Sequence, residues 1–222
     1  MLAAPCPPVA HAAALPALHA PLRADVDGDG RVDVITIRIA RRAPVTCGLL
    51  LAVRTRTGTR AARIYYDGMK FDTAGRLVDY ERFPFVNGAL ALDRRRGLEV
   101  VVTAWEGASN SFLQLFAIRH GTLVRLRLPS PVQTGFSWGG FAEAYGGIDC
   151  TRGGLRATST SYIRGHRWRV DRVFYRVGER AVRIIRTQTF RGGDAVVARF
   201  SRELSERIPF PSCRGIRARR QL

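Results

Sequence analysis

Four aspartates and two glycines occupy residues 25–33, DVDGDGRVD, and a strand-like segment follows at once. Like charges this close together repel each other, and more strongly inside a fold than in water, because the effective dielectric is lower. The loop can therefore fold in one of two ways. Either its side chains splay into solvent around a turn, or a positive charge lies among them.

The spacing D-x-D-x-D-G-x-x-D is typical of a calcium loop. Asp25, Asp27 and Asp29 stand at positions 1, 3 and 5, the backbone carbonyl of Arg31 is at position 7, and Asp33 is at position 9. Hard oxygen ligands in this order can wrap a calcium ion. We therefore predict a Ca²⁺ site formed by these five residues. The alternative is a polar turn whose carboxylates are solvated.

The loop differs from an EF-hand in two respects. An EF-hand needs an acidic residue at position 12, which here is Thr36, and a flanking helix, whereas this loop leads into a strand. Asp33 can close a shorter loop instead. Gly28 and Gly30 permit the positive φ angles that such a tight loop needs.

The remaining pattern indicates an all-β chain. In residues 34–39, β-branched residues alternate with a period of two, which predicts a strand. Further strand-like segments are separated by turns at Gly58, His120-Gly121, Gly165-His166 and Gly178-Glu179; these segments are residues 47–68, 98–105, 110–128 and 155–189. Only residues 194–207, DAVVARFSRELSER, are typical of a helix. We expect an all-β fold with one short C-terminal helix.

The chain also repeats itself. When Glu99 is placed on Asp33, residues 92–102 align with residues 26–36, and residues 116–128 match residues 174–186. The predicted organisation has three repeat-like units, each ending in a hairpin, within a single domain that includes the helix. Its parts are an N-terminal arm at 1–23, units at 24–85, 86–135 and 136–192 within a domain at 24–213, and a basic tail at 214–222.

The second copy of the loop has lost most of the ligands of the first. Arg95 replaces Asp29, and Ala91 replaces Asp25. An arginine beside Asp93 and Glu99 would supply the positive charge that a metal ion supplies in the first loop. We therefore predict that Arg95 lies within salt-bridge reach of one of these two carboxylates.

The segment VDGDGRVDVITI, residues 26–37, resembles the FG-GAP, or VCBS-type, repeat of integrin-like β-propellers and secreted bacterial proteins. Residues 98–150 are also similar to bacterial VCBS repeat-containing proteins, and the resemblance spans about residues 24–190. It implies propeller-blade-like antiparallel sheets, calcium in the first loop, export from the cell and no known catalysis. Three blade-like units would make an incomplete propeller, because closure takes four or more.

Four cysteines are spread along the chain without a C-x-x-C pair: Cys6, Cys47, Cys150 and Cys213. This spacing excludes zinc ribbons and thioredoxin-like motifs, and it suits two disulfides in an oxidising compartment, although buried free thiols stay possible. Tying each irregular end of the chain to its nearest unit gives Cys6–Cys47 and Cys150–Cys213. The rival pairing is Cys6–Cys213 with Cys47–Cys150.

The N-terminal arm is apolar and rich in prolines and small residues, but it lacks the basic start and continuous apolar core of a signal peptide. It is either a truncated leader or an extended arm. No run of about twenty apolar residues is present, so we predict no membrane span. With the cysteines, this favours an extracellular or cell-surface monomer.

The net charge is +18, and almost every basic residue is an arginine, with Lys70 the single lysine. So basic a protein adheres to anionic partners such as nucleic acid or acidic polymers. Residues 164–176, RGHRWRVDRVFYR, mix arginines with aromatic residues, as nucleic-acid-binding surfaces do. We favour the plainer interpretation, an amphipathic hairpin with Trp168, Val170 and Phe174 facing the core and arginines outside.

A hydrolase is the least favoured alternative. GFSWG at 135–139 matches the G-x-S-x-G nucleophile elbow, with Ser137 as the nucleophile and Asp149 and His166 in the expected order. The glycine-rich segment that follows is too short for the required helix, and the four histidines do not cluster.

We therefore expect a non-catalytic, exported, calcium-binding β-repeat protein with an extracellular ligand, for which an anionic polymer is one candidate. A polyanion- or nucleic-acid-binding protein is the second hypothesis.

Overall fold

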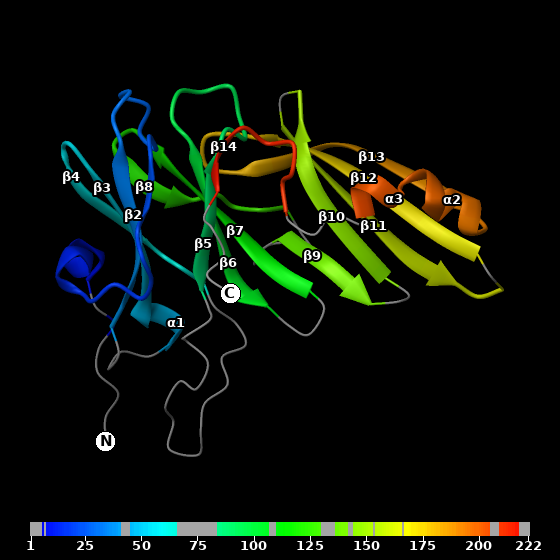
Figure 1. The fold of residues 1–222 in the computed structure, drawn as a ribbon, viewed down its shortest axis with the longest axis horizontal. Coiled ribbons are helices and arrows are strands. Elements are labelled where there is room, and N and C mark those ends of the chain that lie inside the picture. The colour runs from blue at the N-terminus through cyan, green and yellow to red at the C-terminus, as the bar shows by residue number, and fades with distance from the viewer. Residues whose placement is uncertain are drawn as a thin grey trace, which may run out of the picture.

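The computed structural model describes residue 6 and residues 8–40, 45–65, 84–106, 110–129, 136–141, 144–152, 154–165, 167–204 and 209–217. Within these residues the chain is mostly antiparallel β-structure with a few short helices (Figure 1). The predicted all-β class with a short helical segment near the C-terminus is confirmed. No described helix is long and apolar enough to cross a membrane.

The first sheet has four strands in the order β1-β2-β3-β4. These strands are β1 (Leu22–Ala24), β2 (Asp33–Ile39), β3 (Leu49–Thr55) and β4 (Gly58–Arg63). The alternation seen in the sequence places Ile35, Ile37 and Ile39 on one face of β2, where all three are buried. Two short helices lie before β3, namely η1 (Val9–Ala14) and α1 (Val45–Gly48).

The second sheet has ten strands in the order β13-β12-β11-β10-β9-β7-β6-β5-β14, with β8 paired to β7. The strands are β5 (Phe85–Leu90), β6 (Glu99–Glu106), β7 (Asn110–Arg119), β8 (Thr122–Arg125), β9 (Phe136–Phe141), β10 (Ala144–Thr151), β11 (Gly154–Ile163), β12 (Arg167–Val177), β13 (Val182–Gly192) and β14 (Gly215–Arg217). Helices α2 (Asp194–Arg199) and α3 (Ser201–Leu204) follow β13.

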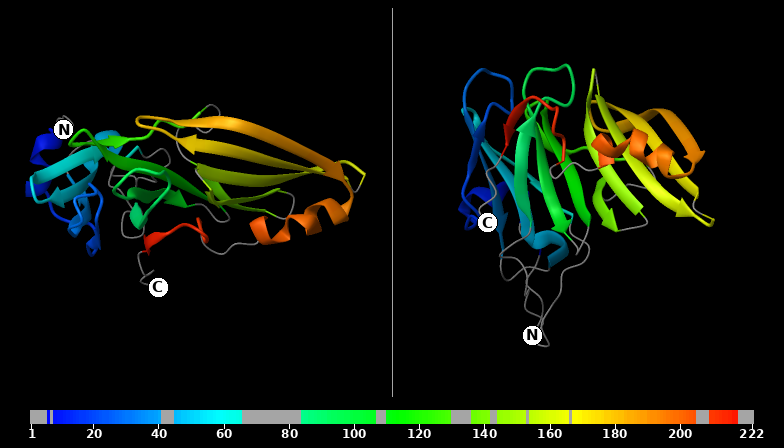
Figure 2. Two further views of the ribbon diagram at one scale, coloured as in Figure 1. Left: turned by 90° about the horizontal axis from the view of Figure 1, so that it is seen from above. Right: turned by 45° about the vertical axis from the view of Figure 1, so that its right-hand side comes forward.

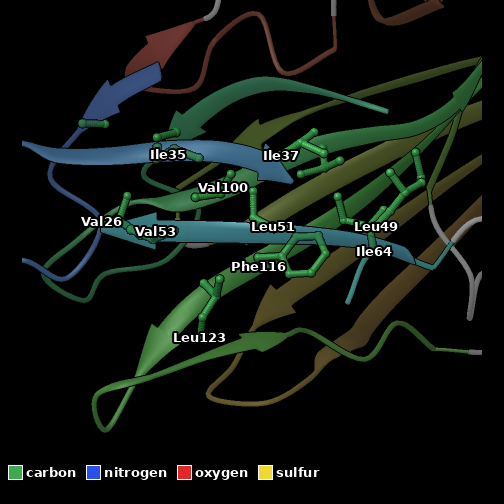
Figure 3. Close-up of a cluster of buried hydrophobic side chains, with 14 of the residues drawn as sticks. Val26, Ile35, Ile37, Leu49, Leu51, Val53, Ile64, Val100, Phe116 and Leu123 are labelled. Atoms are coloured by element: carbon green, nitrogen blue, oxygen red, sulfur yellow. The ribbon is translucent and has the colours of Figure 1, made fainter. Parts of the chain in front are cut away.

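The first four strands pack face to face on β5–β8. Figure 3 shows the core between them, in which Ile35 and Leu51 of the first sheet meet Val100 and Phe116 of the second. All four side chains are fully buried. The first two units thus bury each other's apolar faces, which neither could do alone.

The second and third units are joined edge to edge. Strand β7 is ten residues long and β8 only four, so β8 pairs with residues 116–119 and leaves the other half of the same edge free. That half, residues 110–113, pairs with β9, which continues through β10 to β13. The difference in strand length therefore makes one continuous sheet out of two units, an arrangement that the sequence repeat did not predict.

The C-terminal helical segment packs on one face of the third unit (Figure 2). Glu203 of α3 binds the helical segment to strands β11 and β12. Its carboxylate lies 2.9 Å from Arg172 Nη2 and 3.3 Å from Arg156 Nε, and it accepts a hydrogen bond of 2.6 Å from the Thr158 hydroxyl. The sequence predicted one helix over 194–207, whereas the structure has two short helices separated at Phe200, and residues 205–207 lie outside the described ones.

Strand β12 is amphipathic, but one arginine lies on the helix-covered face. Val170 is buried there and Trp168 and Phe174 are half-buried, as the sequence predicted. Arg172 shares this face, with its guanidinium 5.3 Å from the ring centre of Phe174 and equally far from that of Phe200. Cation–π contacts of this kind let an arginine act as part of the packing.

Two disulfides join Cys6 to Cys47 and Cys150 to Cys213, with Cα–Cα distances of 5.6 and 5.1 Å. The predicted pairing is confirmed, and none of the four cysteines is free. The first bridge ties the arm to the beginning of β3, and the second ties β10 to the segment after the helices. Two disulfides in a chain of this size indicate an oxidising compartment.

The Cys150–Cys213 bridge closes a loop between residues 63 positions apart. We expect the double variant Cys150→Ser/Cys213→Ser to lose about 4 kcal/mol of unfolding free energy, because its unfolded chain regains the entropy of that loop. Urea denaturation of the oxidised proteins measures this. The Cys6→Ser/Cys47→Ser variant, with its 41-residue separation, should lose slightly less. An unchanged unfolding free energy in the first variant would contradict the expectation.

Candidate metal centre

Three aspartates of the first loop converge. One carboxylate oxygen from each of Asp25, Asp27 and Asp29 lies within 4.8 Å of the other two. Calcium binds oxygen at 2.3–2.6 Å, so two oxygens on one ion are at most about 5 Å apart. The three side chains therefore fit a single hard cation. Asp25 and Asp27 are half-buried and Asp29 is exposed, so an ion would be reachable from solvent.

The loop backbone fixes these carboxylates in place. Asp25 accepts hydrogen bonds from the N–H groups of Gly28 at 2.8 Å and Gly30 at 3.0 Å. Asp27 accepts from Asp29 N–H, and Asp29 accepts from Arg31 N–H. A polar turn without metal would show the same bonds. Because the carboxylates also converge on one another, the loop could hold a cation.

Gly28 and Gly30 both have positive φ angles, of 81° and 83°. Other residues rarely adopt this conformation, so the two glycines are needed for the tight loop, as the sequence predicted.

Asp33 has a different place in the loop. It is almost fully buried, and its Oδ2 accepts hydrogen bonds from the N–H groups of Val26 at 2.8 Å and Asp27 at 3.2 Å. Its carboxylate does not belong to the converging group. Burial raises the pKa of Asp33 above its ordinary value, and the nearby Asp27 and Asp25 charges add to this, while the two N–H donors oppose it. Asp33 thus anchors the beginning of the loop to β2.

The second loop repeats two of the hydrogen bonds of the first. Leu92 N–H donates to Glu99 Oε2 at 2.9 Å, as Val26 N–H does to Asp33. Arg95 N–H donates to Asp93 Oδ1 at 2.7 Å, the counterpart of the bond between Asp29 and Asp27. These equivalent bonds support the alignment of the two loops made from the sequence.

The principal cation of the second loop is Arg119, at the end of β7. Its Nη2 lies 2.8 Å from Asp93 Oδ2 and 2.7 Å from Glu99 Oε1, and all three side chains are at most 7% exposed. Arg95 is within reach of Asp93 as predicted, but only at 4.0 Å and with its side chain half exposed. The sequence argument missed Arg119. The sole signal was its position directly before the turn at His120-Gly121.

The first unit has no cation at the corresponding place. Thr55 ends β3 just before its hairpin turn, as Arg119 ends β7, and each of the two pairs with the residue three positions on. The Thr55 hydroxyl bonds to Gly58 O and is neutral. Among the described residues, neither Asp25 nor Asp27 nor Asp29 forms an ion pair within 4.0 Å. The first loop thus carries more carboxylates, and no described arginine forms an ion pair with its three converging aspartates.

A pocket of about 310 Å³ adjoins this loop. Two hairpin turns contribute to it, one from each of the first two units, and its walls include Asp27, Asp29, Thr55, Arg60 and His120. The aspartate loop is therefore accessible from a hollow that both units form.

The two loops also pack against each other. Leu98 N–H donates to Asp25 O at 3.1 Å, and Gly28 and Gly97 lie at the crossing with positive φ angles. A Cβ on Gly28 would lie 2.7 Å from the carbonyl carbon of Arg96, and one on Gly97 would clash with Val26 O. Larger residues are excluded at both positions, so the geometry of one loop is coupled to that of the other.

The residues of the hydrolase hypothesis lie in a different setting. Residues 136–139 belong to β9, which pairs with β7 and β10, whereas a nucleophile elbow is a strand-to-helix turn. Gly135 and His166 lie outside the described residues. Asp149 is buried and accepts hydrogen bonds from the N–H groups of Cys150 and Ser212, both at 2.8 Å.

The described histidines are dispersed. His19 bonds to Pro84 O, and His120 pairs with Glu179.

Comparison with protein-family models, curated proteins and solved structures finds no match to this chain. The resemblance to FG-GAP repeats therefore stays a prediction from the sequence.

Replacing Arg119 should destabilise the protein strongly. In Arg119→Met, Asp93 and Glu99 stay buried without a counter-charge, which typically costs about 3–5 kcal/mol. Burial already raises the pKa of Glu99, an effect larger than the opposing bond from Arg119. Removing Arg119 should raise the pKa of Glu99 further. A higher folded-state pKa means that protonation stabilises the folded variant more than the folded wild type, so the loss of unfolding free energy should shrink as the pH is lowered from about 7 to about 5.

Urea denaturation at both pH values measures the effect. Arg95→Met is the matched control, and it should cost only about 0–1 kcal/mol because its ion pair is long and half exposed. Equal losses in the two variants would show that Arg119 is not the principal cation.

Proposed function

We propose that this chain is a non-catalytic, calcium-binding β-repeat protein that acts outside the cell as a binding or structural module. The observation that carries the proposal is a contrast between two equivalent loops. Arg119 neutralises the second loop, whereas the first has three converging aspartates beside the neutral Thr55. A bound cation would provide in the first loop what Arg119 provides in the second.

The ligand chemistry favours calcium. Asp25, Asp27 and Asp29 supply carboxylate oxygens, and the Arg31 carbonyl is the candidate for a neutral oxygen at position 7. Calcium accepts six to eight oxygens in flexible geometry, so water can complete its shell at this solvent-accessible edge. Magnesium demands a stricter octahedron. Asp33, fixed to the loop backbone, would hold the site in shape and complement its charge.

An extracellular setting agrees with such a site. The two disulfides place the chain in an oxidising compartment, and export from the cell is the proposed reason. Calcium modules outside cells commonly bind with dissociation constants of about 10⁻⁴–10⁻³ M. A loop this exposed suits that range. The resemblance to FG-GAP repeats also supports an extracellular calcium site.

Binding of an acidic polymer is the second candidate function. It is favoured by three exposed arginines, Arg167, Arg169 and Arg191, on the face of β12 and β13 opposite the helices. Other arginines, such as Arg172 and Arg186, lie on the helix-covered side and stack on aromatic rings. Because the positive charge is divided between both faces, it forms no single stripe, so we rank this function below calcium binding.

Calorimetric titration with Ca²⁺ tests the proposal. We expect one ion per chain with a dissociation constant of about 10⁻⁴–10⁻³ M. Asp27→Asn should weaken binding at least about tenfold, because it removes one charged ligand. Asp171→Asn, which removes a carboxylate of β12 far from the loop, is the control and should bind like the wild type. Heats that are absent, or equal in the wild type and Asp27→Asn, would refute the site.

A further inference from the structure

Strand β13 forms one edge of the ten-stranded sheet, and β12 is its one partner among the described strands. At its beginning the outer side is occupied, since Val182 N–H donates to Arg127 O. From residue 183 to residue 192, no backbone hydrogen bond to the outer side is made by any described residue. Figure 2 shows β13 as the long border of the sheet, with the helices over its face and not along its edge. The strand therefore presents a row of N–H and C=O groups with which no described residue pairs.

Long open edges of this kind are usually covered or blocked, because they accept further strands. Here the edge carries apolar side chains in addition. Ile184 is 45% exposed and Ile185 is 55% exposed. A strand laid along β13 would satisfy the backbone groups and cover both isoleucines.

The charge of this edge is of one sign. Residues 180–193 contain four arginines and no acidic residue. Arg183, Arg186 and Arg191 are exposed, and none forms an ion pair with a described residue. In an antiparallel or parallel pair, opposite charges on neighbouring strands attract and like charges repel. An added strand should therefore be acidic.

We propose that the outer edge of β13, residues 183–192, binds an extended acidic segment of a partner protein as an additional β-strand. Backbone hydrogen bonds would give affinity. Carboxylates on both faces of the added strand would give specificity, beside Arg183 and Arg186 on the helix-covered face and beside Arg191 on the other. A second copy of β13 fits poorly, since two copies would bring six arginines together without one acid. Nucleic acid would satisfy the arginines but could not continue the backbone ladder. The proposal does not depend on calcium.

The test uses a fluorescent synthetic peptide as long as β13, in which pairs of glutamates alternate with pairs of valines, so that both faces of the added strand carry carboxylates. Its anisotropy is followed with the full-length protein in a chelator. Two further peptides carry N-methyl groups on alternate residues, one on the odd and one on the even positions. Successive N–H groups of a strand point to opposite edges, so only one of these peptides loses the bonds to β13. We expect that peptide to bind at least about tenfold more weakly and the other to bind almost normally.

Variants of the protein locate the binding surface. The triple variant Arg183→Glu/Arg186→Glu/Arg191→Glu should lose at least about tenfold in affinity. The matched variant Arg54→Glu/Arg56→Glu/Arg152→Glu changes the same charge at exposed positions elsewhere and should bind the peptide much more tightly than the triple variant of β13. Circular dichroism and thermal melting check that both variants are folded.

Four outcomes would overturn the proposal. If both N-methylated peptides bind equally, the contact is general electrostatic adhesion. If the two triple variants lose affinity equally, the site is not β13. If the acidic peptide fails to bind at all, or if the protein without peptide sediments as a dimer that Arg183→Glu/Arg186→Glu/Arg191→Glu dissolves, the edge has another occupant.

Discussion

Asp93 and Glu99 are buried at the beginning of β6 because Arg119 reaches both carboxylates from the end of β7. Without that guanidinium, two like charges would lie together in a region of low dielectric. The pair of bonds ties the loop before β6 to the far end of the hairpin strand. The second loop, held in this way, is the surface on which the first loop packs through Gly28 and Gly97. The shape of the aspartate cluster thus depends on an ion pair outside it.

The hairpin turns beside the aspartate loop connect the three units. The side chain of Arg60, from the first hairpin, donates to Gly121 O in the second, and His120 of the second pairs with Glu179 of the third. These contacts are exposed and individually weak. The apolar core between β1–β4 and β5–β8 and the strand pairing of β7 with β9 carry the larger share of the assembly. The hairpin contacts set how the turns surround the pocket beside the aspartate loop.

Features that depend on neighbouring residues could be predicted from the sequence. The alternation in β2, the turn at Gly58, the equivalence of the two loops and the helical segment near the C-terminus belong to this class, although the division of that segment at Phe200 does not. The disulfide pairing was also predictable, because each irregular end had one near partner. Arg119 was not, since it lies twenty positions after Glu99 on another strand. The pairing of β7 with β9 was not predicted for the same reason. It depends on the unequal lengths of β7 and β8, which no local sequence pattern encodes.

We propose that two equivalent loops balance their carboxylates differently, one with a bound ion and one with the tethered Arg119. A crystal structure of the protein in excess calcium, with anomalous diffraction to identify the ion, tests it most directly. We expect one calcium peak, bound by Asp25, Asp27 and Asp29, and none beside Asp93. A peak in the second loop, or a well-ordered first loop without any ion, would show that the two loops are not balanced in this way.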